Sequence, residues 1–367
     1  MDVVVSKGAA RLSIGAFFFL AGVCFASWAS RIPDIKQYLN LSDGGLGAVL
    51  LALPVGLLIS LPFSGWLVTH FGSRQMVIPA AISYALLLPL IGLAHSAWQL
   101  VAVLFFFGLV GNLLNIAMNT QAGSLVAIYG RSIIASFHGI WSLAGFTGAW
   151  VGTLMVNLRL APLQHFIIIS IAAVIITFLC FRNTLRQDIN TGSDRPIFAK
   201  PDARLLSLGL IALCCMVCEG TMFDWSGVYF RKVVDVPQGL TTLGYTAFMG
   251  TMAGGRFVGD WLATRLGTKR MLQNSGVIIA EGLSLAIIFP YIVTATAGFL
   301  LVGIGVSSVV PLVYGAAGRS KNFSPGVALA AVSTIGYLGF LPGPPMIGFI
   351  AEAYDLRVSF SVIAVLG

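Results

Sequence analysis

Charged residues are scarce in this chain, because Asp, Glu, Lys and Arg make up only 9% of its 367 residues. A soluble domain carries about 25% charged residues, so water cannot be the solvent for most of this surface. Long runs contain no charged residue at all, among them 44–73, 75–130 and 282–318. A helix needs about 20 apolar residues to cross the hydrocarbon core of a bilayer. The sequence therefore excludes a soluble fold and predicts a membrane protein with many spans.

Residues that build catalytic or metal sites are also few. All five cysteines, Cys24, Cys180, Cys214, Cys215 and Cys218, lie in apolar runs, which is typical of buried small side chains rather than of disulfides or metal ligands. The loops carry no cluster of His, Asp and Glu and no Gly-rich phosphate cradle. We therefore expect no cofactor, no metal and no enzymatic activity.

The net charge of +8 is distributed in a way that indicates orientation in a membrane. Lys and Arg collect between apolar spans; with the N-terminus inside, fourteen fall on the cytoplasmic side, six fall outside and Arg256 lies within a span. This asymmetry orients membrane proteins and is not a phosphate-binding pattern. We expect a monomer in the bacterial inner membrane, surrounded by lipid, with the N-terminus cytoplasmic and with no nucleic-acid partner.

Breaks at charges, Gly/Pro clusters and polar turns divide the chain into twelve predicted helices. The first six cover 11–31, 44–69, 75–94, 97–126, 132–158 and 162–182, and the second six cover 204–230, 238–266, 270–291, 294–318, 324–351 and 357 onward. The polar segment between them cannot enter lipid. We therefore predict an all-α membrane protein with a six-helix bundle over 1–182, a cytoplasmic linker over 183–203 and a second six-helix bundle over 204–367.

An internal repeat relates the two predicted bundles. Residues 65–74 (GWLVTHFGSR) and 260–269 (DWLATRLGTK) are identical at four of ten positions, with an offset of 195. Both copies lie where a second helix meets a loop. Two parallel six-helix repeats are one way in which transporters are built. The offset places the end of the twelfth helix near residue 377, so we expect the last helix to be truncated at Gly367.

The repeat also carries a family resemblance, to the major facilitator superfamily, along essentially the whole chain. The superfamily loop reads Gly-x-x-x-Asp-x-x-Gly-Arg-Arg, and the matching positions are Gly65, Gly72 and Arg74 in the first copy and Gly267, Lys269 and Arg270 in the second. Threonine stands where the acid is expected, at Thr69 and Thr264. The segments 28–33 (WASRIP) and 137–142 (FHGIWS) resemble bacterial permeases related to the fucose permease branch. This resemblance implies alternating access, a sugar-like solute and proton coupling.

Polar side chains at membrane depth are costly, so each is a candidate functional residue. Asn112, Asn115 and Asn119 lie on one helix face and are suited to hydrogen-bonding a solute. Hydrogen bonds between packed helices are the alternative interpretation.

A second set of candidates combines aromatic rings with polar groups. His138, Trp141 and Ser142 form a stripe that is suited to stacking on a sugar or planar ring, and Trp28 and Tyr337 complete the predicted substrate-binding residues. Simple packing of the indole and a structural role for the imidazole are equally consistent with the pattern.

Acidic residues at membrane depth are the candidates for proton coupling. Glu219 and Asp224 lie within the predicted seventh span and can carry a proton between two aqueous sides. A static ion pair or a hydrogen bond to the backbone is the alternative. Arg256 has Asp260 one turn away, so we favour a local ion pair; the alternative is that Arg256 acts on Glu219.

The predicted gating residues are Arg31, Gly65, Gly72, Arg74, Asp260, Gly267 and Lys269. Arg31 lies at the outer end of the first span, where anchoring at the membrane interface is the alternative role. Glycines and prolines crowd residues 336–348, which predicts a hinge in the eleventh span.

We therefore expect a secondary transporter that takes up a small polar solute with protons. A proton-driven exporter of drugs or metabolites is the first alternative, and a membrane-embedded enzyme or scaffold is a distant one.

Overall fold

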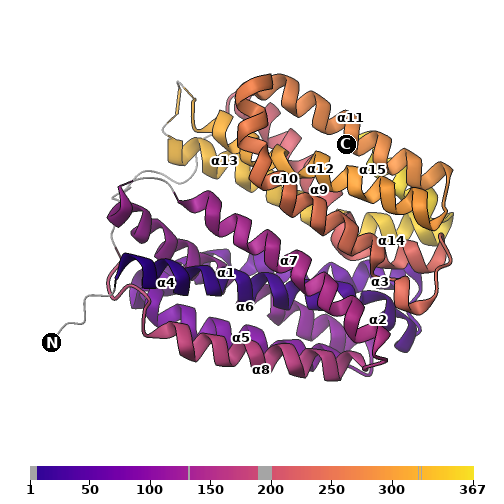
Figure 1. The fold of residues 1–367 in the computed structure, drawn as a ribbon, viewed down its shortest axis with the longest axis horizontal. Helices are drawn as coiled ribbons and strands as arrows, with labels where there is room; N and C mark the ends of the chain where they lie inside the picture. Colours follow the sequence, from indigo (N-terminus) through magenta and orange to yellow (C-terminus); the bar gives the residue numbers. More distant parts are fainter. Residues whose placement is uncertain (1–5, 131–132, 189–200, 321, 324) are drawn as a thin grey trace. The chain divides into compact units, whose positions relative to one another are not determined.

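The computed structural model describes residues 6–130, 133–188, 201–320, 322–323 and 325–367, apart from the side chains at 135, 260, 325 and 326. The described residues form helices and connecting turns, so the predicted all-α fold is confirmed (Figure 1). Ten segments are long and apolar enough to cross a membrane. Within the described part of the chain, each of the twelve predicted spans overlaps one or more helices. The prediction worked because each span needs an uninterrupted apolar run.

The helices fall into two compact units. The first contains α1 (Lys7–Ser30), α2 (Ile32–Tyr38), α4 (Ala52–Phe71), α5 (Ser73–Gly92), α6 (Ala97–Tyr129), α7 (Ile134–Asn157) and α8 (Pro162–Phe181). The second contains α3 (Asp43–Leu50), α9 (Ala203–Lys232), α10 (Leu243–Leu266), α11 (Thr268–Ile288), α12 (Ile292–Ala317), α13 (Pro325–Tyr337), α14 (Gly343–Ala353) and α15 (Leu356–Leu366), with short 3-10 turns over Gln238–Leu240 and Leu338–Phe340.

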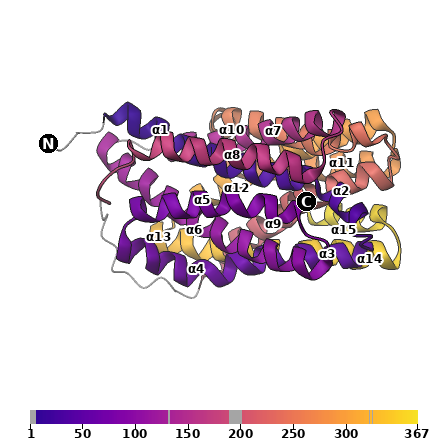
Figure 2. The same cartoon turned by 90° about the horizontal axis from the view of Figure 1, so that it is seen from below.

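Both units use the same set of helix pairings. In the first unit α1 packs on α7, α6 packs on α4 and α5, and α5 lies beside α8 (Figure 1). In the second unit α9 packs on α13, α12 packs on α10 and α11, and α11 lies beside α15. Helix α3 packs on α14 (Figure 2). The repeat found in the sequence is therefore also a repeat of packing within each unit.

The two copies of the repeated loop share an unusual backbone conformation. Gly72 precedes α5 with φ 88° and ψ 147°, and Gly267 precedes α11 with φ 78° and ψ 151°. A side chain with a Cβ atom is strained in this region, which glycine occupies almost alone. Gly72 and Gly267, which occupy the same position of the repeat, are thus required by the backbone conformation of the turn.

Caps and breaks set the ends of several helices. Asp202 accepts a hydrogen bond from the backbone N–H of Leu205 at 2.8 Å, which starts α9. This hydrogen bond also holds the pKa of the Asp202 carboxyl below its usual value. In the predicted eleventh span, α13 ends at Tyr337 and α14 begins at Gly343, beside Pro342. The Gly/Pro cluster therefore interrupts this helix where the sequence places it.

Candidate functional site

An acid and a base face each other in the second unit. Helix α9 places Glu219 near its middle, where only 6% of the residue is exposed. Arg256 of α10 brings its Nη2 atom to 3.4 Å from Glu219 Oε1. The sequence favoured a local pair between Arg256 and Asp260, whose side chain lies outside the described atoms. The contact with Glu219 joins residues 37 positions apart, so helix packing rather than local spacing creates it.

Three tyrosines, on α10, α12 and α13, lie within electrostatic range of this acid. The phenol groups of Tyr245, Tyr314 and Tyr337 interact electrostatically with Glu219. The hydroxyls of Tyr245 and Tyr314 are buried and have no hydrogen-bond partner among the described residues. Buried polar groups nearly always have a partner, which is a solvent molecule or a ligand where the protein supplies none. We call Glu219, Arg256, Tyr245, Tyr314 and Tyr337 the acid–arginine cluster.

Asp224 lies on α9 five residues after Glu219 and is partly buried. The i, i+5 spacing turns it away from Glu219 by roughly 140° around the helix axis. It interacts electrostatically with Tyr245, which interacts with Glu219 as well. Tyr245 is therefore within electrostatic range of both predicted proton carriers.

A small cavity adjoins the cluster between α10 and α12. Its lining consists of Arg256, Gly259, Ser307, Ser308, Pro311 and Leu312. The two serine Oγ atoms lie 3.4 Å apart. The cavity has a volume of about 20 Å³, and three of its six lining residues are polar.

The three predicted asparagines of α6 have different surroundings. Asn112 is buried, and its Nδ2 donates to Ser60 Oγ on α4 at 2.8 Å. This is the interhelical hydrogen bond that was the alternative interpretation. Asn119 Nδ2 donates to Asn115 Oδ1 at 2.9 Å, and both of these residues are partly exposed. Asn115 and Asn119 consequently form a pair that a solute could reach, whereas Asn112 holds helices together.

The aromatic candidates divide in a similar way. His138 on α7 is exposed and meets the Phe18 ring edge-on at 5.7 Å, and Trp141 lies 6.4 Å from Phe25. Ser142 is fully buried, and its hydroxyl donates to the His138 carbonyl at 3.0 Å. Trp28 is only 1% exposed, and its Nε1 has no acceptor among the described residues. Tyr337, by contrast, is 38% exposed.

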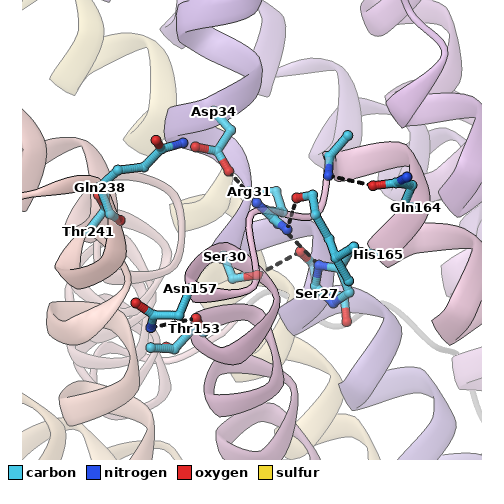
Figure 3. A network of polar contacts seen from close by, with 12 residues as sticks. Ser27, Ser30, Arg31, Asp34, Thr153, Asn157, Gln164, His165, Gln238 and Thr241 are labelled. Atoms are coloured by element: carbon cyan, nitrogen blue, oxygen red, sulfur yellow. Dashed lines mark hydrogen bonds and ion pairs between the residues drawn. The ribbon is translucent and has the colours of Figure 1, made fainter.

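Arg31 lies in a buried polar network of the first unit (Figure 3). Its guanidinium pairs with Asp34 at 2.6 Å, donates from Nε to His165 Nδ1 at 3.2 Å and donates from Nη2 to the Leu160 carbonyl at 2.7 Å. Arg31 is 1% exposed and His165 is fully buried. The charge of Arg31 is therefore paired inside the first unit, and its gating role stays a prediction. Sequence reasoning missed His165, for which the signal is only a lone histidine in an apolar run.

The loop residues of the first repeat lie at the end of α4 and the start of α5. Arg74 stacks over the Phe181 ring at 4.8 Å. Thr69, which stands where the superfamily loop has an acid, donates from its hydroxyl to the Gly65 carbonyl at 3.0 Å. In the second copy Lys269 is exposed on the first turn of α11. The Asp260 side chain, predicted as a gating group, is not among the described atoms.

Comparison with known proteins connects this geometry to a family. Residues 12–324 match the sequence profile of the Major Facilitator Superfamily. A Yersinia pestis protein named as an uncharacterized MFS-type transporter is 33% identical over 356 residues, which is 97% of this chain and 92% of that protein. An Acinetobacter baylyi protein named as a cis,cis-muconate transport protein is 25% identical over 363 residues, with 90% and 84% coverage. The solved structure of the nucleoside transporter NupG superposes with a TM-score of 0.75 at 15% identity and covers 97% of each chain.

Proposed function

The chain belongs to the Major Facilitator Superfamily, and on that premise we propose that it moves a small polar solute across the bacterial inner membrane by proton-coupled alternating access. The observation that carries this proposal is the Glu219–Arg256 contact, which is partly buried near the middle of α9 and α10. An ionised acid at the centre of a spanning helix costs about 2.5–3.5 kcal/mol. An ionisable residue within a span is therefore a functional candidate. The Arg256 guanidinium at 3.4 Å offsets part of the free-energy cost of the Glu219 charge.

Proton coupling follows from the chemistry of this pair. When Glu219 is ionised, Arg256 and the acid neutralise each other. When Glu219 takes a proton, this acid no longer offsets the charge of Arg256. The state of the acid therefore determines what Arg256 attracts, which is the property a coupled carrier needs. Asp224 is a second acid through which a proton can enter or leave, with Tyr245 interacting with both carboxyl groups.

The solute class comes from the first unit and from the family resemblance. Asn115, Asn119, His138 and Trp141 are at least partly exposed and offer amide, imidazole and indole groups. These groups suit a sugar-like solute, which binds through hydroxyl hydrogen bonds and ring stacking. We therefore propose a sugar-like solute, in line with the resemblance to permeases of the fucose permease branch. The relatives carry names with different solutes, so names alone do not settle the choice.

The orientation proposed here places the N-terminus and the central linker in the cytoplasm. The distribution of Lys and Arg between the loops supports it, since basic residues are enriched on the cytoplasmic side of membrane proteins. We propose that a single chain suffices for transport, because each unit has its own packed core of helices.

Uptake by proteoliposomes with an imposed pH gradient tests proton coupling. A screen of sugars, sugar acids, nucleosides and amino acids for a raised melting temperature first selects the solute, since ligands stabilise the folded state that binds them. We expect an inward proton gradient to drive its accumulation, and Glu219→Gln and Asp224→Asn to abolish that drive. Glu281→Gln is the matched control, because Glu281 is an exposed acid in the middle of α11.

Two results would change the proposal. Accumulation that ignores both the gradient and the two substitutions would refute coupling through these acids. Expulsion of the solute driven by an inward proton gradient would instead identify a proton-driven exporter. Equilibrium exchange of labelled solute in the Glu219→Gln protein, with no net accumulation, would support the acid as the coupling group.

A further inference from the structure

An exposed tryptophan with a base one turn later occurs in both copies of the repeated sequence. In the first copy the rings of Trp66 and His70 stack with their centroids 5.1 Å apart. In the second copy the Arg265 guanidinium lies over the Trp261 ring, 4.3 Å from its centroid. The two tryptophans are 58% and 54% exposed. The acid–arginine cluster contains neither pair, so the repeat places a surface feature outside the proposed coupling site.

The exposed face of α10 changes in character along the helix. Phe257 and Val258 are apolar, yet they are 65% and 51% exposed. Trp261 follows one turn after Phe257, and the exposed Arg265 follows one turn later, next to the helix end at Leu266. At 100° per residue, Phe257, Trp261 and Arg265 lie within about 80° of one face. The order along this face is therefore apolar, aromatic and then cationic.

Two further cations follow the turn after α10. Lys269 and Arg270 are exposed on the first turn of α11. Together with Arg265 they outnumber Asp260, the one acid of residues 257–271, whose side chain lies outside the described atoms. This end of the second unit therefore combines an exposed apolar stripe with a net positive charge.

The same order of groups occurs along a phospholipid, from its acyl chain to its phosphate. Tryptophan rings are enriched at the headgroup level of a bilayer, and basic residues beside an anionic leaflet attract its headgroups. The donor fork of arginine matches phosphate oxygens. A rise of 1.5 Å per residue separates Phe257 from Arg265 by about 12 Å along the helix axis. An acyl chain lying on Phe257 and Val258 consequently brings its headgroup to Trp261 and Arg265.

We propose that this end of α10 and α11 binds an anionic glycerophospholipid. Arg265 and Lys269 hold the phosphate, and an acyl chain packs on Phe257 and Val258. The site lies outside the coupling residues, so it goes beyond the proposed transport function. In the orientation proposed above, the lipid belongs to the cytoplasmic leaflet.

The first copy of the repeat differs in the groups that would hold a phosphate. Its tryptophan stacks on the imidazole of His70 instead of a guanidinium. Arg74, the arginine of its loop, stacks over the Phe181 ring at 4.8 Å. We therefore assign the lipid site to the second copy alone, and the first copy serves as an internal control.

Binding of matched lipids by the purified full-length protein tests the proposal. Delipidated protein in detergent is titrated with phosphatidylglycerol, with phosphatidylcholine of the same acyl chains and with glycerol phosphate, and bound molecules are counted by native mass spectrometry. We expect phosphatidylglycerol to bind preferentially and to raise the melting temperature. The preference should fall as salt rises, because exposed charges are screened. Arg265→Gln combined with Lys269→Gln should weaken phosphatidylglycerol binding about tenfold or more.

Control variants separate loss of the site from loss of the fold. Arg265→Lys combined with Lys269→Arg keeps both charges and should retain the lipid preference, which a variant that merely misfolds would not do. Arg357→Gln removes an exposed arginine that donates to the Ile287 carbonyl, at the opposite end of α11 from Lys269. His70→Gln changes the pair of the first copy. Both of these single variants should bind lipid as the wild-type protein does.

Three outcomes would overturn the proposal. Equal affinity for the two lipids would mean that the headgroup charge is not recognised. A preference that survives the loss of both Arg265 and Lys269 would place the lipid elsewhere. Glycerol phosphate that binds as tightly as phosphatidylglycerol would indicate an anion site without an acyl chain. Failure of proton-coupled transport would leave the lipid result unchanged, because neither a solute nor a gradient enters this measurement.

Discussion

The backbone N–H of Ser73 donates a hydrogen bond to Asp188 Oδ2 at 2.7 Å, and the Ser73 hydroxyl donates to the other oxygen of the same carboxylate. Ser73 is the first residue of α5, and Asp188 follows the end of α8. The superfamily loop carries an acid where this chain has Thr69. Here an acid from a segment 115 residues away satisfies the start of α5. Gln121 of α6 supports the arrangement, since its Nε2 donates to Ser73 Oγ at 2.7 Å.

Removal of the Asp188 carboxylate should destabilise the first unit. Loss of a side-chain cap at a helix N-terminus costs about 0.5–2 kcal/mol, so Asp188→Ala should lower the melting temperature of the purified protein. The control is Gln187→Ala, which changes an exposed neighbour and should have no effect. Equal melting temperatures for the two variants would mean that the Asp188 contact contributes nothing.

The two repeated glycines should be intolerant of alanine for one conformational reason. Gly267 has φ 78° and nothing within 4 Å of an added Cβ, so strain of the backbone is the only penalty. We expect Gly72→Ala and Gly267→Ala each to cost about 1–3 kcal/mol, measured by chemical denaturation.

Gly65 supplies the matched control for this pair. It lies inside α4 with no atom within 4 Å of an added Cβ. Alanine within a helix is more favourable than glycine by about 0.5–1 kcal/mol, so Gly65→Ala should stabilise the protein. If all three alanine variants changed stability in the same direction, the strain argument for Gly72 and Gly267 would be wrong.

The helices could be predicted from the sequence, whereas most of the polar contacts could not. An apolar run long enough to span a bilayer is a local property, and so is the Gly/Pro cluster that ends α13. The contact of Arg31 with His165 joins residues 134 positions apart, so no local sequence pattern predicts it. Arg256 illustrates the same limit, because Asp260 is its neighbour in sequence but Glu219 is the acid at 3.4 Å. Asn112 is predicted from the sequence to bind the solute, whereas its hydrogen bond to Ser60 depends on how α4 and α6 pack.

Replacement of His165 should destabilise the network around Arg31. The imidazole Nδ1 accepts from Arg31 Nε at 3.2 Å, and the pair is fully buried. His165→Phe keeps a ring of similar size but removes this acceptor. An unsatisfied buried donor costs about 1–3 kcal/mol, so the free energy of unfolding should fall by that amount. His70→Phe changes an exposed histidine of the same unit and should have a much smaller effect, and equal losses would argue against a specific role for the Arg31 contact.

Asp43 and Lys232 form an ion pair in which the acid is buried and the lysine is half-exposed. Lys232 Nζ lies 2.5 Å from Asp43 Oδ2, and the acid side chain is 5% exposed whereas the lysine is 50% exposed. Asp43 opens the short helix α3, where Glu352 of α14 also accepts from the Gly44 backbone N–H at 3.0 Å. Two carboxylates thus hold the start of α3, one through an ion pair and one through a helix cap.

The burial of the acid predicts an asymmetric double-mutant cycle. Lys232→Gln leaves a buried carboxylate without its cation, so it should cost more than the ~1 kcal/mol typical of exposed pairs. Asp43→Asn leaves a half-exposed lysine, which water can solvate, and should cost less. The double variant should be more stable than Lys232→Gln alone, because the uncompensated charge is gone. Hydrogen exchange of the α3 amides measures the effect locally. Additive losses in the cycle would mean that the two groups do not interact, and protection of α3 would then rest on Glu352 and on packing against α14.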